Sequence, residues 1–171
     1  MKSQIILTLL FISALATVER DSNQEALEGV WSYFNQKGPF TVTKCGTDQD
    51  HKDAFLFTGY FLRKADIAQT SEINPLIAEG QQFYNSLPLE TRNCFENNQE
   101  VIDLGKFLGI DKYTEDELQN KVSNWVGTHF FVYKRLIKTA GSDWNKWEDY
   151  EQTGRDLAEL LQRILTDAQE Q

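Results

Sequence analysis

The chain has 171 residues, of which 17 are Lys or Arg and 26 are Asp or Glu, so its formal net charge is −9 at pH 7. An acidic surface of this kind repels nucleic acid and anionic lipid, and we therefore expect no nucleic-acid partner. No apolar run beyond residue 16 is long enough to cross a bilayer, so we expect no stable membrane insertion once that first segment is removed.

The first sixteen residues have the layout of a secretory signal peptide. Lys2 precedes about twelve largely apolar residues that end in Ala14-x-Ala16. A membrane anchor is the alternative, but the run is shorter than the ~20 residues that a spanning helix needs. We expect residues 1–16 to be cleaved, which removes only Lys2 among the charged residues, and residues 17–171 to fold as one domain in the secretory lumen or outside the cell.

Two cysteines are present, Cys45 and Cys94. In an oxidising compartment an even count indicates one disulfide. If the thiols were free, a cysteine nucleophile paired with a histidine would remain an alternative.

Helical periodicity dominates the first two thirds of the mature chain. Ser22 followed by Glu25 has the pattern of a capping box, and Gly38-Pro39 is expected to end that helix. The stretch 40–44 has strand-like residues without a partner strand, so we expect an extended connector there. The other predicted helices run over 50–70, from Asn74-Pro75 to 86, through Cys94, and over 101–108.

The last third predicts two long helices. Thr114 and Glu117 form a second capping-box pattern, and apolar residues then alternate four and three apart as far as Gly141. The same spacing returns from Trp147 to Ala168. Two such helices joined by a short turn predict an antiparallel αα-hairpin. The fold class is therefore all-α, a single-domain helical bundle of about five to seven helices with a C-terminal αα-hairpin and one disulfide.

The sequence contains no motif of a known catalytic or metal site. Asp48, Asp50, His51 and Asp53 begin like a calcium loop, but Asp53 stands where that loop needs glycine and Gly59 where it needs glutamate. Acidic residues at a helix N-terminus explain the cluster better. The same applies to the acidic runs 115–117 and 148–149. We expect no catalytic residue, metal or cofactor, and a protein that is not an enzyme.

Aromatic residues are abundant, with four Trp, six Tyr and eleven Phe. A core of large side chains explains them most simply, and an interhelical pocket for a small apolar ligand is the alternative. Gly154 lies in mid-helix, where glycine costs about 1 kcal/mol relative to alanine. Close approach of another helix would explain this glycine, and a ligand resting on it is the alternative. The possible ligand pocket comprises Trp125, His129, Trp147, Tyr150, Gly154 and Leu157.

The helical chain with its two cysteines and the pattern Trp147-x-x-Tyr150-x-x-x-Gly154-x-x-x-Ala158-x-Leu160-Leu161 resembles small secreted proteins of ciliated protozoa. The resemblance covers most of the mature chain. It implies secretion and a helical fold, and it brings no activity and no site residue with it.

Three functions follow as hypotheses. The first is a secreted, non-enzymatic binding or interaction protein that contacts an unknown protein partner or a small apolar ligand, which includes carriage in an interhelical pocket. The second is a structural or cargo protein of secretory granules or of an extracellular matrix. The third is an enzyme of unrecognised type.

Overall fold

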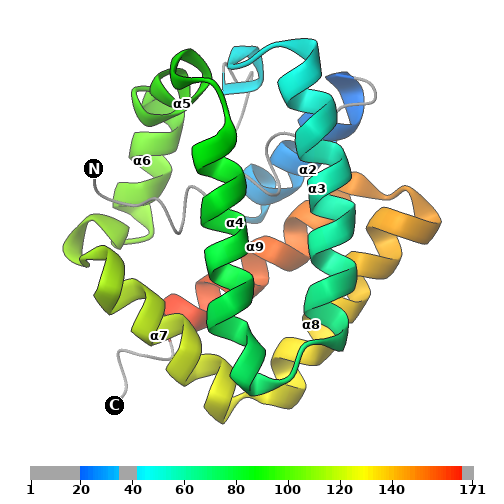
Figure 1. Cartoon of the computed structure of the whole chain (residues 1–171), viewed down its shortest axis with the longest axis vertical. Coiled ribbons are helices and arrows are strands. Elements are labelled where there is room, and N and C mark those ends of the chain that lie inside the picture. Colours follow the sequence, from blue (N-terminus) through cyan, green and yellow to red (C-terminus); the bar gives the residue numbers. More distant parts are fainter. Residues whose placement is uncertain (1–19, 35–41, 167–171) are drawn as a thin grey trace.

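A computed structural model describes residues 20–34 and 42–166, and these residues contain helices and turns but no strand. The predicted all-α class is confirmed, whereas the predicted signal peptide (residues 1–16) and the predicted helix end at Gly38-Pro39 lie outside the described residues. The helices pack into a single bundle in which α3 and α4 lie side by side in front of α9 (Figure 1). The α-helices are α2 (Arg20–Tyr33), α3 (Asp48–Ile67), α4 (Ile73–Ser86), α5 (Leu89–Glu96), α6 (Gln99–Phe107), α7 (Glu115–Thr128), α8 (Phe130–Ser142) and α9 (Tyr150–Thr166).

Local capping determines where two of these helices begin. Thr47 caps α3, because its hydroxyl accepts from the Asp50 amide at 3.2 Å while the Asp50 carboxylate accepts from the Thr47 amide at 2.8 Å. Thr114 and Glu117 make the same reciprocal pair at α7, which confirms the capping box predicted there. At the N-terminal end, α2 begins at Arg20, so Ser22 lies inside the helix and is not its cap.

The predicted helix 114–141 is two helices, which raises the number of described α-helices to eight. The break is at His129, whose φ of −117° and ψ of 32° leave the helical region. The Thr128 hydroxyl donates to the carbonyl of Asn124 at 3.0 Å, a local bond of the kind that bends helices. The His129 ring then stacks on Trp125 with centroids 4.9 Å apart.

Helices α2 and α9 cross with their backbones in direct contact. A Cβ added at Gly154 would lie 1.9 Å from the Ala26 carbonyl oxygen, and one added at Gly29 would lie 2.0 Å from that of Glu151. No side chain fits at either position. The close approach of a neighbouring helix that Gly154 suggested is therefore what the structure shows, and the backbone of α2 occupies the place of the alternative ligand.

The C-terminal αα-hairpin is formed by α8 and α9. The buried Thr153 hydroxyl of α9 lies 3.3 Å from the Ala140 carbonyl oxygen of α8, to which it donates. The two helices are joined by a π-helical turn (Asp143–Trp147, labelled η4), in place of the direct helix–turn–helix connection that the heptad spacing predicted. Trp147 belongs to this turn and is 64% exposed, so its expected place in the apolar seam of the last helix is wrong.

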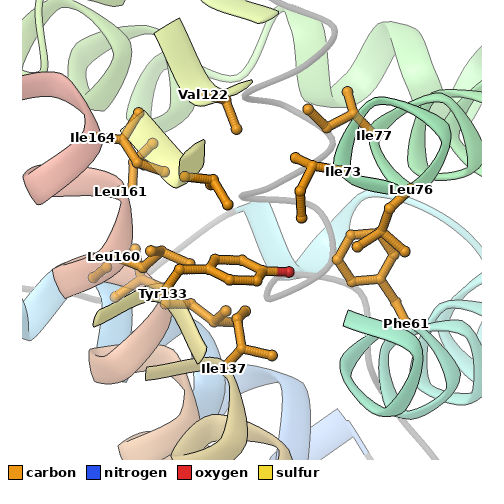
Figure 2. Close-up of a pocket in the computed structure, with 14 residues that line it drawn as sticks. Phe61, Ile73, Leu76, Ile77, Val122, Tyr133, Ile137, Leu160, Leu161 and Ile164 are labelled. Carbon is orange, nitrogen blue, oxygen red and sulfur yellow. The ribbon is translucent and has the colours of Figure 1, made fainter. Parts of the chain in front are cut away.

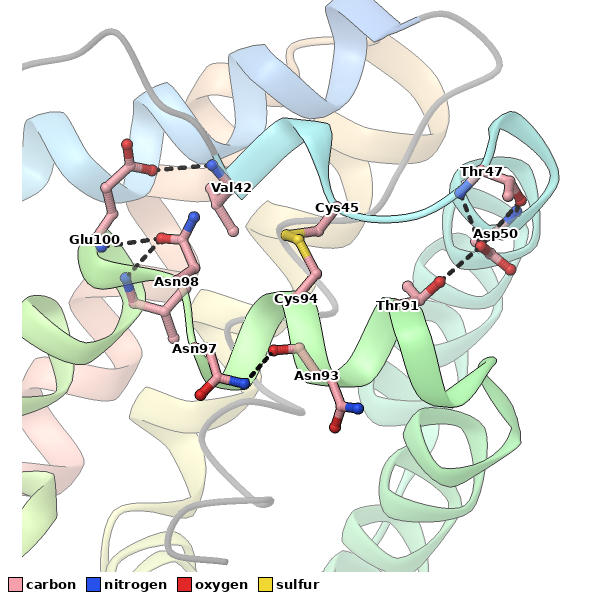
Figure 3. Close-up of a disulfide and its surroundings, with 11 residues drawn as sticks. Val42, Cys45, Thr47, Asp50, Thr91, Asn93, Cys94, Asn97, Asn98 and Glu100 are labelled. Atoms are coloured by element: carbon pink, nitrogen blue, oxygen red, sulfur yellow. Dashed lines mark hydrogen bonds between the residues drawn. A yellow bond between two sulfur atoms is a disulfide. The ribbon is translucent and has the colours of Figure 1, made fainter.

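The disulfide Cys45–Cys94 is present, with 5.5 Å between the two Cα atoms. It joins the segment between the 3-10 turn Val42–Lys44 and α3 to α5, and Figure 3 shows hydrogen bonds on either side of it. The Thr91 hydroxyl donates to Asp50 at 3.0 Å, and the Val42 amide donates to Glu100 at 3.0 Å. Residues 42–44 form a 3-10 turn, which the Cys45 amide closes by donating to the Val42 carbonyl at 3.0 Å, so the expected extended connector is wrong for these residues.

Candidate ligand-binding cleft

The structure does not gather the six residues of the predicted pocket in one cavity. Leu157 lines an interior cavity, and Tyr150 lines a separate cleft at the surface. Trp125 and His129 stack on each other at the break between α7 and α8. Gly154 is covered by α2, and Trp147 extends into solvent. The heptad spacing predicted that these six residues share one face. The break at His129 and the π-helical turn instead place them in different parts of the bundle.

The interior cavity lies between α2, α3, α4, α7, α8 and α9 and has a volume of about 60 Å³. Figure 2 shows aliphatic side chains around it, with the Tyr133 hydroxyl directed towards Phe61 and Ile73. That hydroxyl lies 3.3 Å from the Ala65 carbonyl oxygen, to which it donates. A dry apolar cavity that binds benzene has ~150 Å³, so this one is too small for a lipid chain.

The surface cleft is larger, at about 190 Å³, and lies between α3 and the π-helical turn. Three rings that contact one another form its aromatic wall, with centroid separations of 5.0 Å for Phe55–Trp144, 4.9 Å for Trp144–Tyr150 and 5.8 Å for Phe55–Tyr150. Gly59 lets this wall approach α3, since a Cβ there would lie 3.2 Å from the Trp144 Nε1 atom. The cleft is lined by Phe55, Leu56, Gly59, Arg63, Trp144, Asn145, Glu148 and Tyr150.

Two exposed side chains of opposite charge line this cleft, Arg63 from α3 and Glu148 from the turn. Arg63 Nη1 donates to Asn145 Oδ1 at 2.6 Å, and Asn145 Nδ2 donates to the Gly141 carbonyl at 2.9 Å. Among the described residues, neither Arg63 nor Glu148 belongs to an ion pair. Both charges are therefore free to meet charges on a ligand.

The backbone places Glu148 in an unfavourable conformation. Its φ of 54° and ψ of 30° lie in the left-handed region, where a residue with a Cβ costs roughly 1–2 kcal/mol. The π-helical turn requires this reversal, because the Asp149 amide bonds back to the Asp143 carbonyl at 3.0 Å. Both π-helical turns and left-handed non-glycine residues are found preferentially at functional sites.

Two carboxyl groups interact next to the same turn, Asp143 within it and Asp156 in α9. Asp156 of α9 is 7% exposed and accepts from Gln152 at 2.8 Å through Oδ1, whereas its buried Oδ2 accepts no hydrogen bond. Burial raises the pKa of Asp156 to about 6, and the charges of Asp143 and Glu159 add to the effect. Burial also raises the pKa of Asp143, with Asp149 contributing. Because a carboxylate only accepts, Asp143 and Asp156 can bond to each other only when one is protonated.

The groups that line the cleft are suited to binding. The guanidinium can hold an anion, the carboxylate can hold a cation, and the aromatic wall can contact an apolar body. Ser, Thr, Cys, His and Lys are absent from the eight residues that line the cleft, and its oxygen-bearing side chains are those of Asn145, Glu148 and Tyr150. Outside the cleft, the segment that begins like a calcium loop contributes Asp50 to the cap of α3. Burial acts to raise the pKa of Asp50, but hydrogen bonds from Thr47 and Thr91 have the larger effect and lower it.

Comparisons with protein-family models, with curated proteins and with solved structures find no match to this chain. The resemblance to secreted proteins of ciliated protozoa therefore stays a hypothesis. Within the described residues, no helix is both long and apolar enough to span a membrane.

Of the eight residues that line the cleft, the predicted pocket contains only Tyr150. Sequence reasoning missed the other seven, which are Phe55, Leu56, Gly59, Arg63, Trp144, Asn145 and Glu148. The interpretation of Glu148-Asp149 as a capping pair is correct for Asp149, whose carboxylate accepts from the Gln152 amide at 3.0 Å. A glycine in the apolar run of α3 was the available signal, because a mid-helix glycine indicates close approach by another group.

Proposed function

We propose that the protein is a secreted, non-enzymatic binding protein whose ligand occupies the cleft between α3 and the π-helical turn. One observation supports this most strongly: Arg63 and Glu148 line one cleft beside an aromatic wall, and neither is engaged by an opposite charge of the described chain. Secretion is supported by the signal-peptide layout of residues 1–16 and by the disulfide, which is typical of an oxidising compartment.

The apolar-carrier alternative has less support. The interior cavity of about 60 Å³ is lined by core residues such as Leu161 and Ile77. A lipid chain would have to separate packed helices before it could enter, with loss of the contacts that hold the core.

The structural or cargo alternative rests on exposed apolar side chains. Leu56, Tyr60 and Ile67 follow one another on α3 at helical spacing and are 57%, 46% and 78% exposed, and Phe131 at the start of α8 is 87% exposed. Exposed apolar residues of this kind are common at interfaces between proteins, and they are also present singly on most surfaces.

Native mass spectrometry of the protein purified from its source tests the proposal. We expect a mature chain that begins near Thr17 and carries one small molecule at unit stoichiometry. Hydrogen exchange of the recombinant chain with that molecule added back should show protection in α3 and in residues 143–150. A homo-oligomer or a stable complex with other proteins, without a small molecule, would favour the structural alternative and contradict the proposal.

A further inference from the structure

The arrangement of charges in the cleft restricts the chemistry of its ligand. Arg63 presents a guanidinium whose Nη1 is held at 2.6 Å by Asn145, so its plane is oriented while its other N–H groups remain available. A planar guanidinium suits a carboxylate, which it can bind through two parallel hydrogen bonds.

A second donor lies on the same wall. Trp144 is 3% exposed and lines the cleft, and its indole Nε1 makes no hydrogen bond to a described residue. The indole nitrogen lies on the α3 side of the cleft, where a Cβ added at Gly59 would be 3.2 Å from it. An indole N–H donates only, so together with Arg63 it makes this wall a site for an acceptor group.

Glu148 supplies the complementary charge. It lines the same cleft but forms no ion pair with Arg63, although two such side chains at contact distance would attract each other. Its left-handed backbone places a carboxylate where glycine would be the less costly residue. A ligand that carries both a carboxylate and an ammonium would satisfy the two side chains together.

The size and the aromatic wall limit the rest of the ligand. Pockets for drug-sized molecules have ~300–1,000 Å³, whereas this cleft has about 190 Å³. Leu56 and the three rings of the aromatic wall leave an apolar surface beside the charged groups. We infer that the cleft binds a free α-amino acid with an apolar or aromatic side chain, through its carboxylate at Arg63 and its ammonium at Glu148. This inference rests on the proposed binding function of the cleft.

Isothermal titration calorimetry of the full mature chain with three ligands tests the inference. L-phenylalanine carries both charges, N-acetyl-L-phenylalanine keeps only the carboxylate, and L-phenylalaninamide keeps only the ammonium. The last two also represent a C-terminal and an N-terminal peptide residue, so the comparison separates a free amino acid from a peptide end. We expect L-phenylalanine to bind saturably at one site and each analogue to bind at least about tenfold more weakly, because each lacks one charge-assisted contact.

Two variants assign each contact to its side chain. In Arg63→Gln, L-phenylalanine and the amide should bind equally, because the carboxylate no longer has its partner. In Glu148→Gln, L-phenylalanine and the N-acetyl compound should bind equally. Arg135→Gln removes an exposed arginine of α8 that does not line the cleft, and it should behave as wild type.

Three results would overturn the inference. They are no saturable binding of L-phenylalanine, an analogue that binds wild type as tightly as L-phenylalanine does, or a tenfold preference for L-phenylalanine over both analogues that remains in both cleft variants. These failures are distinguishable from failure of the binding function itself. If the molecule found by native mass spectrometry binds wild type but not Arg63→Gln, the cleft remains the binding site and only the amino-acid assignment is wrong.

Discussion

At the scale of the residue, the most unusual feature is a buried acid at the hairpin. Asp156 is almost fully buried, its Oδ2 has no partner, and its pKa of about 6 is raised chiefly by burial. At pH 7 the protein therefore keeps a buried charge opposite Asp143, next to the turn that forms the cleft. A buried charge without full pairing lowers stability.

Protonation of Asp156 should therefore stabilise the fold. Its pKa is higher in the folded state than the ordinary 3.8, so the favourable contribution is complete below about pH 4 and is lost as the pH rises through 6. Asp156→Asn, which stays neutral, should be about 2 to 3 kcal/mol more stable than wild type at pH 7 and should lose that advantage by pH 4.

Urea denaturation of both proteins at pH 4, 5.5 and 7 measures this difference. Asp111→Asn, which neutralises an exposed acid in the 3-10 turn after α6, serves as the control and should show no comparable trend. An advantage of Asp156→Asn that is the same at all three pH values would show that burial of the charge is not its cause.

At the scale of the element, the contact of α2 with α9 depends on two glycines. The Ala26 carbonyl occupies the space where a Cβ of residue 154 would be, and backbone atoms cannot move aside as a flexible side chain can. The hydrogen-bonded backbone of α2 would have to shift as a unit, which separates the buried Ala26 and Val30 from α9.

Gly154→Ala should therefore destabilise the protein by about 2 kcal/mol or more, as expected for an overpacked core. Gly105 of α6 is the matched control, because a Cβ there would meet no atom within 4 Å. Gly105→Ala should stabilise by about 0.5–1 kcal/mol, the usual gain for alanine in a helix. Denaturation of both variants at pH 7 checks this, and a Gly154→Ala protein as stable as Gly105→Ala would exclude the close crossing of the helices.

At the scale of the whole molecule, the disulfide connects the two parts of the chain that flank α3 and α4. Cys45 and Cys94 are 49 residues apart in sequence, and Cys45 is 1% exposed. Together with the bonds from Thr91 to Asp50 and from Val42 to Glu100, the disulfide holds α5 and α6 against the start of α3.

Loss of that link should cost about 4 kcal/mol, since closing a loop of this length restricts the unfolded chain by that amount. The double variant Cys45→Ala, Cys94→Ser should show this loss in urea denaturation, and reduced wild type should follow the same curve. This is a large share of the 5–15 kcal/mol that stabilises a typical domain. A loss under about 1 kcal/mol would mean that the other contacts of α5 already fix its position.

The all-α class, most helix positions, the capping box at Thr114 and the pairing of the two cysteines are predictable from the amino-acid sequence. These signals are local, as with Thr114 and Glu117, or depend on counting, as with the two cysteines of the chain. Gly154 also showed from the sequence alone that something approaches α9 closely, but it could not show what.

Only the tertiary structure decided that α2 is the neighbour of Gly154, that the helix 114–141 breaks at His129, and that the cleft lies at the π-helical turn. A heptad pattern does not reveal a break in a helix or an inserted residue. The apolar residues before and after that point keep their spacing although the helix axis changes direction. The members of the cleft, Arg63 and Glu148, are 85 positions apart, so only the packing of α3 against the hairpin brings them together.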